Sequence, residues 1–339
     1  MASLGGNPRF VLQQKAISWY IRAMSSRCQT VGLLLVPGFA LMSYASVVEP
    51  LRAANLLAGR ELYRWVHITP GPEAVTASCG ATVPCVAPAA AGPVDFLFVC
   101  AGGNPAAFRD RATLAWLRAL AAQGVRIGGV SGGPVILAKA GIMDGYHMTV
   151  HWEHAPAVAE AYPNILLTRS IYIVDRNRLT CAGGTAPLDM MHALIAEAHG
   201  PELARKVSDW FMHTDIRPAQ SAQRASLTER YGVHDERLTA ALELMESHPG
   251  EPLSRADTAR RIGLSTRQLD RLFAEKLGTS YAGHYRRLRL ERARDLLRQS
   301  AVPITEIALG CGFSSASHFS RAYREAFRVT PGAERKAPA

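Results

Sequence analysis

The chain has 339 residues, 48% of them hydrophobic, and a formal net charge of +10. This length favours two domains. The hydrophobic fraction is high enough for two ordinary cores and excludes a wholly disordered protein. No apolar run approaches the roughly 18 residues that span a bilayer, and residues 1–27 lack the apolar core of a secretory signal. The six cysteines form no C-x-x-C pair. We therefore expect a cytoplasmic protein that contacts no membrane and holds no metal and no cofactor.

The charge is distributed unevenly along the chain. Residues 1–27 carry 4 basic and no acidic side chains, residues 28–229 carry 15 of each, and residues 230–339 carry 19 basic and 13 acidic ones. The basic region at 230–339 predicts a polyanion partner, and the neutral region at 28–229 predicts a small-molecule partner. Four segments are expected: an N-terminal extension at 1–29, a domain at 30–199, a helical extension and linker at 200–233, and a domain at 234–333.

Short apolar strands alternate with helical stretches between residues 30 and 199. The strands are VGLLLV, WVHIT, DFLFVC, VRIGGV and RLTCA, and the helices cover 46–57, 113–122 and 188–199. Such alternation predicts an α/β domain in which a parallel sheet lies between two helical layers, as in a flavodoxin-like fold.

Three glycine-rich turns leave the carboxyl ends of these strands, at 102–103, 132–133 and 183–184. Ligands of open α/β sheets bind along this edge. After the third turn, Thr185 offers a capping hydroxyl, and unpaired amide groups at this helix start would favour a carboxylate or phosphate. The glycines are equally compatible with close packing of helices on strands. Asp189, on the helix that follows, is expected either to pack against the pocket wall or to contact the ligand.

Ser131 lies at the corner between the strand VRIGGV and the helix that begins near Pro134. Gly129 and Gly133 complete the pattern G-x-S-x-G, in which a strained elbow exposes a nucleophilic hydroxyl. Glycine-flanked serines also form simple turns. A serine nucleophile needs a general base within hydrogen-bond reach, and although His151 is a candidate base, no orienting acid is evident from the spacing.

The last third of the chain contains a repeated unit. The stretches TARRIGLS at 258–265 and IALGCGFS at 307–314 align without a gap, and RLF at 271–273 matches RAY at 321–323. Each copy combines a short helix, a glycine turn, a serine N-cap and a second helix. An arginine-bearing helix at 281–299 joins the copies. This pattern predicts an all-α domain with two helix-turn-helix motifs that binds double-stranded DNA.

The run IALGCGFSSASHFSRAYREAF, followed by Thr330 and Pro331, resembles the signature of the AraC/XylS family of DNA-binding domains. The resemblance covers residues 230–333 and implies two recognition helices about one turn of DNA apart (~34 Å), each in a major groove. Thr258 departs from the aliphatic residue usual at its position. Phosphate contact or solvent exposure is the alternative for every residue that the resemblance places against the bases: Arg267, Gln268, Asp270, Arg271, Ala316, Ser317, His318 and Arg321.

The first domain also carries a resemblance, in VVEPLRAANLLAGRELYRW, AKAGIMDGYHMTVHWE and DRNRLTCAGGTAPLDMMHALI. These stretches resemble the class I glutamine amidotransferase-like (PfpI-like) sensor domain of GlxA-type regulators, and most of all the regulators of carnitine, glycine betaine and arginine catabolism. In catalytic relatives the elbow residue is a cysteine, and an acid approaches it from a place that falls near Ser43 here.

A serine in place of that cysteine favours a binding pocket without catalysis. Phe39, Tyr44 or Trp152 are candidate faces for a cationic head group, and a plain core position is the favoured alternative for each. The pocket residues expected from the resemblance and the turns are Ser131, Gly132, Gly103, His151, Trp152, Gly184 and Thr185.

The sequence therefore predicts a ligand-responsive, sequence-specific transcriptional regulator. We expect an activator that forms a homodimer, acts on RNA polymerase, and responds to a betaine, carnitine or arginine-like compound. The main alternative is an amidase or other hydrolase with Ser131 as nucleophile and an accessory DNA-binding tail. A binder that coats DNA without a ligand is a third interpretation.

Overall fold

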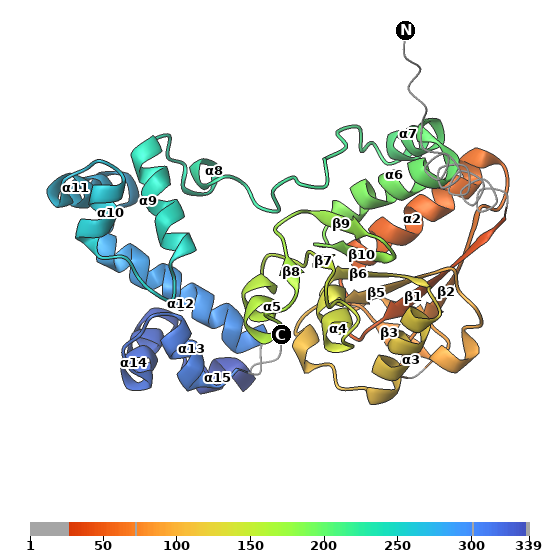
Figure 1. Ribbon diagram of the computed structural model, residues 1–339, viewed down its shortest axis with the longest axis horizontal. Coiled ribbons are helices and arrows are strands. Elements are labelled where there is room, and N and C mark those ends of the chain that lie inside the picture. Colours follow the sequence, from red (N-terminus) through yellow and green to blue (C-terminus); the bar gives the residue numbers. More distant parts are fainter. Residues whose placement is uncertain (1–26, 72, 300–301, 337–339) are drawn as a thin grey trace, which may run out of the picture. The chain divides into compact units, whose positions relative to one another are not determined.

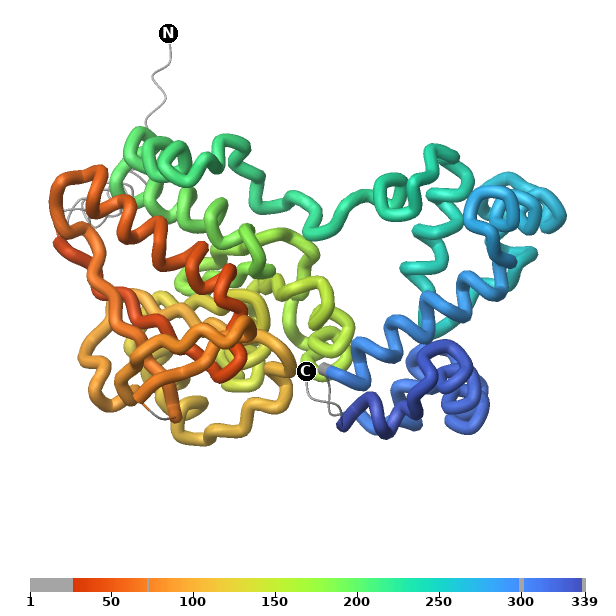
Figure 2. The backbone as a smooth tube through the Cα atoms, turned by 180° about the vertical axis from the view of Figure 1, so that it is seen from behind, coloured from red at the N-terminus to blue at the C-terminus, as the bar shows by residue number. Residues whose placement is uncertain are grey.

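The computed structural model describes residues 27–71, 73–299 and 302–336 (Figure 1). The chain forms two compact units, and Figure 2 shows the path of the backbone through both from behind. Of the described residues, the first unit comprises 27–71, 73–103, 109–151 and 164–221. The second comprises residues 104–108, 152–163 and 222 onward. The predicted N-terminal extension at 1–29 lies almost entirely outside the described residues.

A six-stranded sheet in the order β2-β1-β5-β6-β10-β9 forms the centre of the first unit. The first five strands in this order run parallel to one another, and the last, β9, runs antiparallel to β10. The predicted parallel sheet is therefore confirmed, with one antiparallel edge strand that the sequence analysis did not foresee. The strands are β1 (Gln29–Leu35), β2 (Tyr63–Ile68), β5 (Phe96–Ala101), β6 (Arg126–Ser131), β9 (Tyr172–Asp175) and β10 (Arg178–Cys181).

Helices cover both faces of this sheet, with α2, α6 and α7 on one side and α3 and α4 on the other (Figure 1). The central strand β5 is buried along its whole length because side chains on both of its faces meet a helical layer. Residues such as Leu33, Phe98 and Met190 form one continuous core between the sheet and the layer of α2, α6 and α7. The helices are α2 (Leu41–Ala58), α3 (Arg111–Ala122), α4 (Gly133–Lys139), α6 (Ala186–His199) and α7 (Pro201–Trp210).

Two small sheets and two short helices lie outside this central layer. The antiparallel pair β3 and β4 and the parallel pair β7 and β8 stand apart from the main sheet. Their bounds are β3 (Ala74–Thr76), β4 (Thr82–Pro84), β7 (His147–Met148) and β8 (Leu166–Leu167). The helices are α5 (Ala155–Ala161), in the second unit, and α8 (Leu227–Tyr231), which starts at a capping box of Ser226 and Glu229.

The rest of the second unit is helical and has two cores that share one long helix. Helix α12 supplies Tyr281 and Tyr285 to the first core and Leu290 and Leu297 to the second. A helix of this length, close to 30 Å, is long enough to serve both. The helices are α9 (Glu236–Ser247), α10 (Arg255–Arg261), α11 (Thr266–Leu277), α12 (Tyr281–Gln299), α13 (Ile304–Gly310), α14 (Ala316–Phe327) and α15 (Pro331–Lys336).

The polar residue at the centre of the first helix-turn-helix is accommodated by a hydrogen bond. Thr258 is fully buried, and its Oγ1 lies 2.7 Å from the hydroxyl oxygen of Tyr281. The Tyr281 hydroxyl also donates to the carbonyl oxygen of Leu253 at 3.0 Å. Because its hydroxyl has a partner, Thr258 occupies an aliphatic position without leaving an unsatisfied polar group.

Candidate functional site

The corner predicted at Ser131 is a strained one. Strand β6 ends at Ser131, whose φ of 59° lies in the left-handed region that side chains other than glycine rarely adopt. The amide of Gly132 donates to the carbonyl oxygen of Ala101 on the neighbouring strand at 3.0 Å, and α4 begins at the next residue. This geometry is that of an elbow between strand and helix.

Close packing buries the elbow instead of exposing it. A Cβ on Gly133 would lie 1.9 Å from the carbonyl oxygen of Val99, and a Cβ on Gly183 would lie 2.7 Å from the Cβ of Ser131. Ser131 is only 9% exposed as a result. Within the described residues, no hydrogen bond joins its hydroxyl to an imidazole or a carboxylate. The glycines thus serve the close packing that the sequence left as one of two alternatives.

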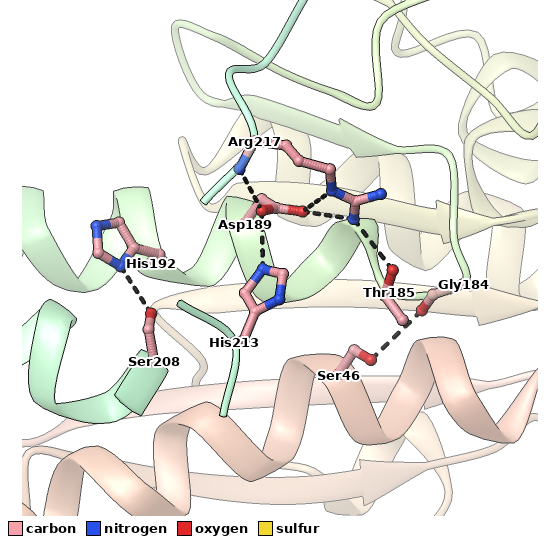
Figure 3. A network of polar contacts seen from close by, with 8 residues as sticks. All are labelled: Ser46, Gly184, Thr185, Asp189, His192, Ser208, His213 and Arg217. Carbon is pink, nitrogen blue, oxygen red and sulfur yellow. Dashed lines mark hydrogen bonds and ion pairs between the residues drawn. The ribbon is translucent and has the colours of Figure 1, made fainter. Parts of the chain in front are cut away.

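The third glycine turn is already bonded to the helix that follows β1. The amide of Gly184 donates to Ser43 Oγ at 2.8 Å. Ser46 Oγ donates to the carbonyl oxygen of Gly184 at 3.3 Å (Figure 3). The expectation of unpaired amides at this helix start is therefore wrong for Gly184. Ser43 takes the place where the resemblance implies an acid, and its hydroxyl serves the backbone of the turn.

Thr185 and Asp189, on the first turn of α6, belong to a network that the sequence did not reveal (Figure 3). Thr185 makes no capping bond, and its Oγ1 accepts from Arg217 Nη2 at 3.0 Å. Asp189 is completely buried. Its Oδ2 accepts from Arg217 Nε at 3.0 Å and Nη2 at 2.6 Å, and its Oδ1 accepts from the Arg217 amide at 2.8 Å and lies 2.9 Å from His213 Nε2.

Sequence reasoning missed Arg217 and His213 altogether. They come from the connection after α7, far along the chain from the turn they support. The signal that could have found them is Asp189 itself, a lone acid within the apolar run APLDMMHALI, because an acid buried there needs a cationic or hydrogen-bonding partner.

The remaining predicted pocket residues are divided between the two units. Gly103, in the turn after β5, has a φ of +56°. His151 closes the second segment of the first unit, whereas Trp152 belongs to the second unit, where the guanidinium of Arg224 lies 4.4 Å from its ring centre. The role of these residues in a pocket stays a prediction.

Two of the three candidate aromatic residues have other partners. Phe39 is completely buried in the core of the first unit. The Tyr44 hydroxyl lies 2.8 Å from His67 Nε2, and burial raises the pKa of this tyrosine to about 12. Phe39 is therefore a core residue and offers no face to a ligand.

The two recognition helices present equivalent surfaces. In α11 the buried residues are Leu269 and Phe273, and in α14 they are Phe319, Ala322 and Tyr323. The predicted contact residues lie on the opposite side of each helix. Those that are exposed, in three equivalent pairs, are Arg267 and Ser317, Gln268 and His318, and Arg271 and Arg321.

Several of the predicted base-reading residues already have partners within the protein, among them Arg271, which lies 3.7 Å from Glu275. Gln268 Oε1 accepts from the amide and the hydroxyl of Ser265, which completes a capping box at the start of α11. Asp270 pairs with Arg255 at 2.7 Å. A bidentate contact of Gln268 with adenine needs its oxygen as well as its nitrogen, so that contact would compete with the cap. Ala316, at the start of α14, is partly exposed.

Several arginines that make this region basic hold the fold together. Arg289 donates from Nε to the carbonyl oxygen of Cys311 at 2.6 Å and from Nη2 to that of Gly312, and its guanidinium lies 4.3 Å from the Phe313 ring centre. Arg294 and Arg298 both pair with Glu334 of α15. The count of basic residues therefore overstates the charge available to a polyanion.

Comparison with known proteins agrees with this architecture. A model of the DJ-1/PfpI family matches residues 29–197, and a helix-turn-helix domain model matches residues 258–337. The HTH-type transcriptional regulator GlxA of Rhizobium meliloti is 48% identical over 92% of this chain and 97% of its own length. The chain belongs to the family of HTH-type transcriptional regulators that includes GlxA. Another similar relative, the regulator CdhR of Pseudomonas aeruginosa, is 42% identical over 92% of this chain and 94% of its own length.

Membership of this family makes the chain a transcriptional regulator with an AraC-type DNA-binding domain and a PfpI-like domain. It confirms the family inferred from the sequence. A solved Vibrio parahaemolyticus protein, 22% identical, superposes on 55% of this chain and 100% of its own with a TM-score of 0.50, which shows the fold alone. No helix in the described part of the chain has the length and apolar content that crossing a membrane requires.

Proposed function

We propose that the regulator reads two adjacent major grooves with α11 and α14 and that it answers to a small molecule with a carboxylate and a cationic amine. Betaines, carnitine and arginine-like compounds have this chemistry. The ligand lies beside the glycine turn after β10, with Ser131, Thr185 and His151 as candidate contacts. The regulator acts as a cytoplasmic homodimer on promoter half-sites and activates RNA polymerase there.

The observation that carries the DNA-reading part is the equivalence of the exposed positions on the two recognition helices. Arg271 and Arg321 occupy the same place in each motif, one helical turn beyond Arg267 and Ser317. An arginine in a major groove can bond the O6 and N7 atoms of guanine together, and each such pair discriminates by about 1–3 kcal/mol. Arg321→Ala is expected to weaken binding to one half of the site and to relax specificity at one base pair.

A role without catalysis is favoured by the state of Ser131. A serine hydroxyl attacks a carbonyl at neutral pH only when a general base takes its proton, and no imidazole or carboxylate within the described residues bonds to this one. The strained elbow at Ser131 is the observation that the hydrolase alternative retains. That alternative predicts turnover of an amide or ester panel that Ser131→Ala abolishes.

Two measurements test the proposal. Anisotropy titrations with promoter fragments compare the wild type with Arg271→Ala, Arg321→Ala and a charge-matched control, Arg205→Ala, on an exposed position of α7. Equal losses in all three variants, or equal affinity for promoter and random fragments, would refute specific reading. A thermal-shift screen with glycine betaine, L-carnitine and L-arginine tests the ligand, because a compound at 100 times its Kd adds about 2.7 kcal/mol to the native state. No shift with any of them would refute the proposed ligand class.

A further inference from the structure

Two short segments of the chain leave the first unit and pack within the second. Residues 104–108 follow Gly103 in the turn after β5, and residues 152–163 follow His151. The first segment contains a short 3-10 helix (Pro105–Ala107) and the second contains α5, and both of these helices contact α12. Gly103 and His151 are two of the predicted pocket residues. Each of these pocket positions is therefore joined directly to a segment that belongs to the DNA-binding unit.

Helix α5 is part of the core of the second helix-turn-helix. Its Ala157 is 8% exposed and packs in the same cluster as Leu290 of α12 and Phe319 of α14. Among the described residues, the core around the first motif contains none from α5. A helix of seven residues is too short to be stable alone, so α5 depends on this packing for its own structure. The docking of α5 is thus specific to the second motif.

Charged side chains surround the contact between α5 and α12. Burial raises the pKa of Asp295 on α12 to about 6, and the carboxylate of Glu153, just before α5, adds to this rise. Arg298 and Arg224 lower this pKa, whereas Glu291 raises it. The ionised carboxylates of Asp295 and Glu153 repel each other. Apolar packing therefore favours the docking of α5 while charge opposes it, and a ligand can shift an equilibrium that is balanced in this way.

We propose that α5 is a regulatory docking helix that carries ligand binding at His151 to the second helix-turn-helix. A ligand held by His151 fixes the residue at the start of this segment, so that docking of α5 then costs less conformational entropy. The docked helix completes the core on which α14 packs, and α14 reads its half-site more tightly as a result. This inference rests on the proposed function, because it names the route from that pocket to the DNA. The ligand should strengthen reading by α14 and leave reading by α11 unchanged.

Hydrogen exchange of the full chain measures the docking of α5. The Val158 amide donates to the carbonyl oxygen of His154 at 3.0 Å, and the Tyr162 amide donates to that of Val158 at 2.9 Å. Both amides should lose protection at least about tenfold in Ala157→Glu, which places a carboxylate in the core. The matched control Ala159→Glu has the same side chain at an exposed position of α5 and should keep their protection within about twofold of the wild type.

Asp295→Asn tests the balance of charge without a change in the packing of the core. It keeps the shape of the side chain and removes the repulsion from Glu153. The same two amides should therefore exchange at least about twofold more slowly than in the wild type at pH 7. Asp209→Asn, at an exposed position of α7, should leave their exchange unaltered. Slower exchange cannot result from a motif that has merely unfolded.

DNA binding of the same proteins tests whether α5 acts on one motif only. Each fragment has one half of the site scrambled, and the half read by α14 is the one whose binding Arg321→Ala weakens. Ala157→Glu should weaken binding to that half at least about fivefold and spare the half read by α11. Glycine betaine, L-carnitine or L-arginine, whichever raises the melting temperature, should strengthen binding to the α14 half in the wild type and in Ala159→Glu but not in Ala157→Glu.

The outcomes separate this inference from the proposed function. Failure of the wild type to bind promoter selectively, or to bind any of the three compounds, refutes the proposed function and the role of α5 with it. If the wild type binds both, a match between Ala157→Glu and Ala159→Glu in exchange or in DNA binding overturns the role of α5 alone. A compound that strengthens binding to both halves equally in the wild type also overturns it, as does exchange that is no slower in Asp295→Asn than in Asp209→Asn.

Discussion

Glu334 is the residue whose replacement should most sharply test the packing of the second helix-turn-helix. It lies on α15 and is 4% exposed, and its Oε1 accepts from Arg294 Nε at 3.1 Å and from Arg298 Nε at 2.7 Å. Both arginines come from α12. Glu334 therefore attaches the last helix to the helix that the two motifs share, and Glu334→Gln removes its charge with almost no change of shape.

The expected loss of unfolding free energy in Glu334→Gln depends on how exposed the two arginine partners are. A hydrogen bond to a charged group contributes about 1.5–3 kcal/mol. The Arg294 and Arg298 side chains are 35% and 45% exposed, so solvent screens both pairs and the lower value applies to each. Both arginines donate to Oε1, so the glutamine oxygen in its place still accepts neutral hydrogen bonds that recover about 1 kcal/mol. We expect a net loss of about 2 kcal/mol in the free energy of unfolding, which lowers the melting temperature of a unit of this size by roughly 5–10 °C.

The pH dependence provides a second signature. Burial raises the pKa of Glu334, but the hydrogen bonds from Arg294 and Arg298 outweigh it and hold the pKa below its ordinary value of 4.5. Because the folded pKa is the lower one, the stabilisation is complete above about pH 4.5 and is lost as the pH falls through the folded value. The difference between wild type and Glu334→Gln should therefore shrink in acid.

Calorimetry of the full chain at pH 7 and pH 3.5 measures both effects. Glu325→Gln, on an exposed position of α14, carries the same charge change and should melt within about 0.5 kcal/mol of the wild type. If Glu334→Gln melts with the control at pH 7, or if its deficit is undiminished at pH 3.5, the reasoning about the buried pair is wrong.

Two further substitutions test the elbow and the second motif. Gly133→Ala places a Cβ 1.9 Å from the Val99 carbonyl oxygen and should lower the free energy of unfolding in urea by at least about 3 kcal/mol. The control Gly71→Ala places a Cβ 4.0 Å from Thr69 Oγ1 and should lower it by less than about 1 kcal/mol. Similar losses in both variants would contradict the packing described. Arg289→Met leaves the Cys311 and Gly312 carbonyls without their donor. It should weaken binding to the half-site read by α14 about tenfold and spare that read by α11 in anisotropy titrations, since a misplaced α13–α14 turn alters one motif only.

The sequence was a good guide wherever a pattern is local. The helix at 281–299 and the motif pairs around Arg271 and Arg321 follow from spacing within one or two helical turns, and α12 has the predicted bounds. Strands such as β5 were recognisable because burial on both faces leaves an uninterrupted apolar run. Strand β9 was missed although Tyr172, Ile173 and Val174 are apolar, because a four-residue strand is too short for its pattern to be distinguished from a loop.

The amino-acid sequence by itself determined the sheet, the two helix-turn-helix motifs and the family, since all of these depend on periodicity and on short-range turn chemistry. Only the tertiary structure decided what the polar groups do: that Ser131 is buried against Gly183, that Ser43 bonds the Gly184 amide, and that Arg217 reaches Asp189. The physical reason is that the partner of a buried polar group is chosen by proximity in space. Arg217 lies 28 positions after Asp189 in the chain, and no local sequence pattern predicts that their side chains meet.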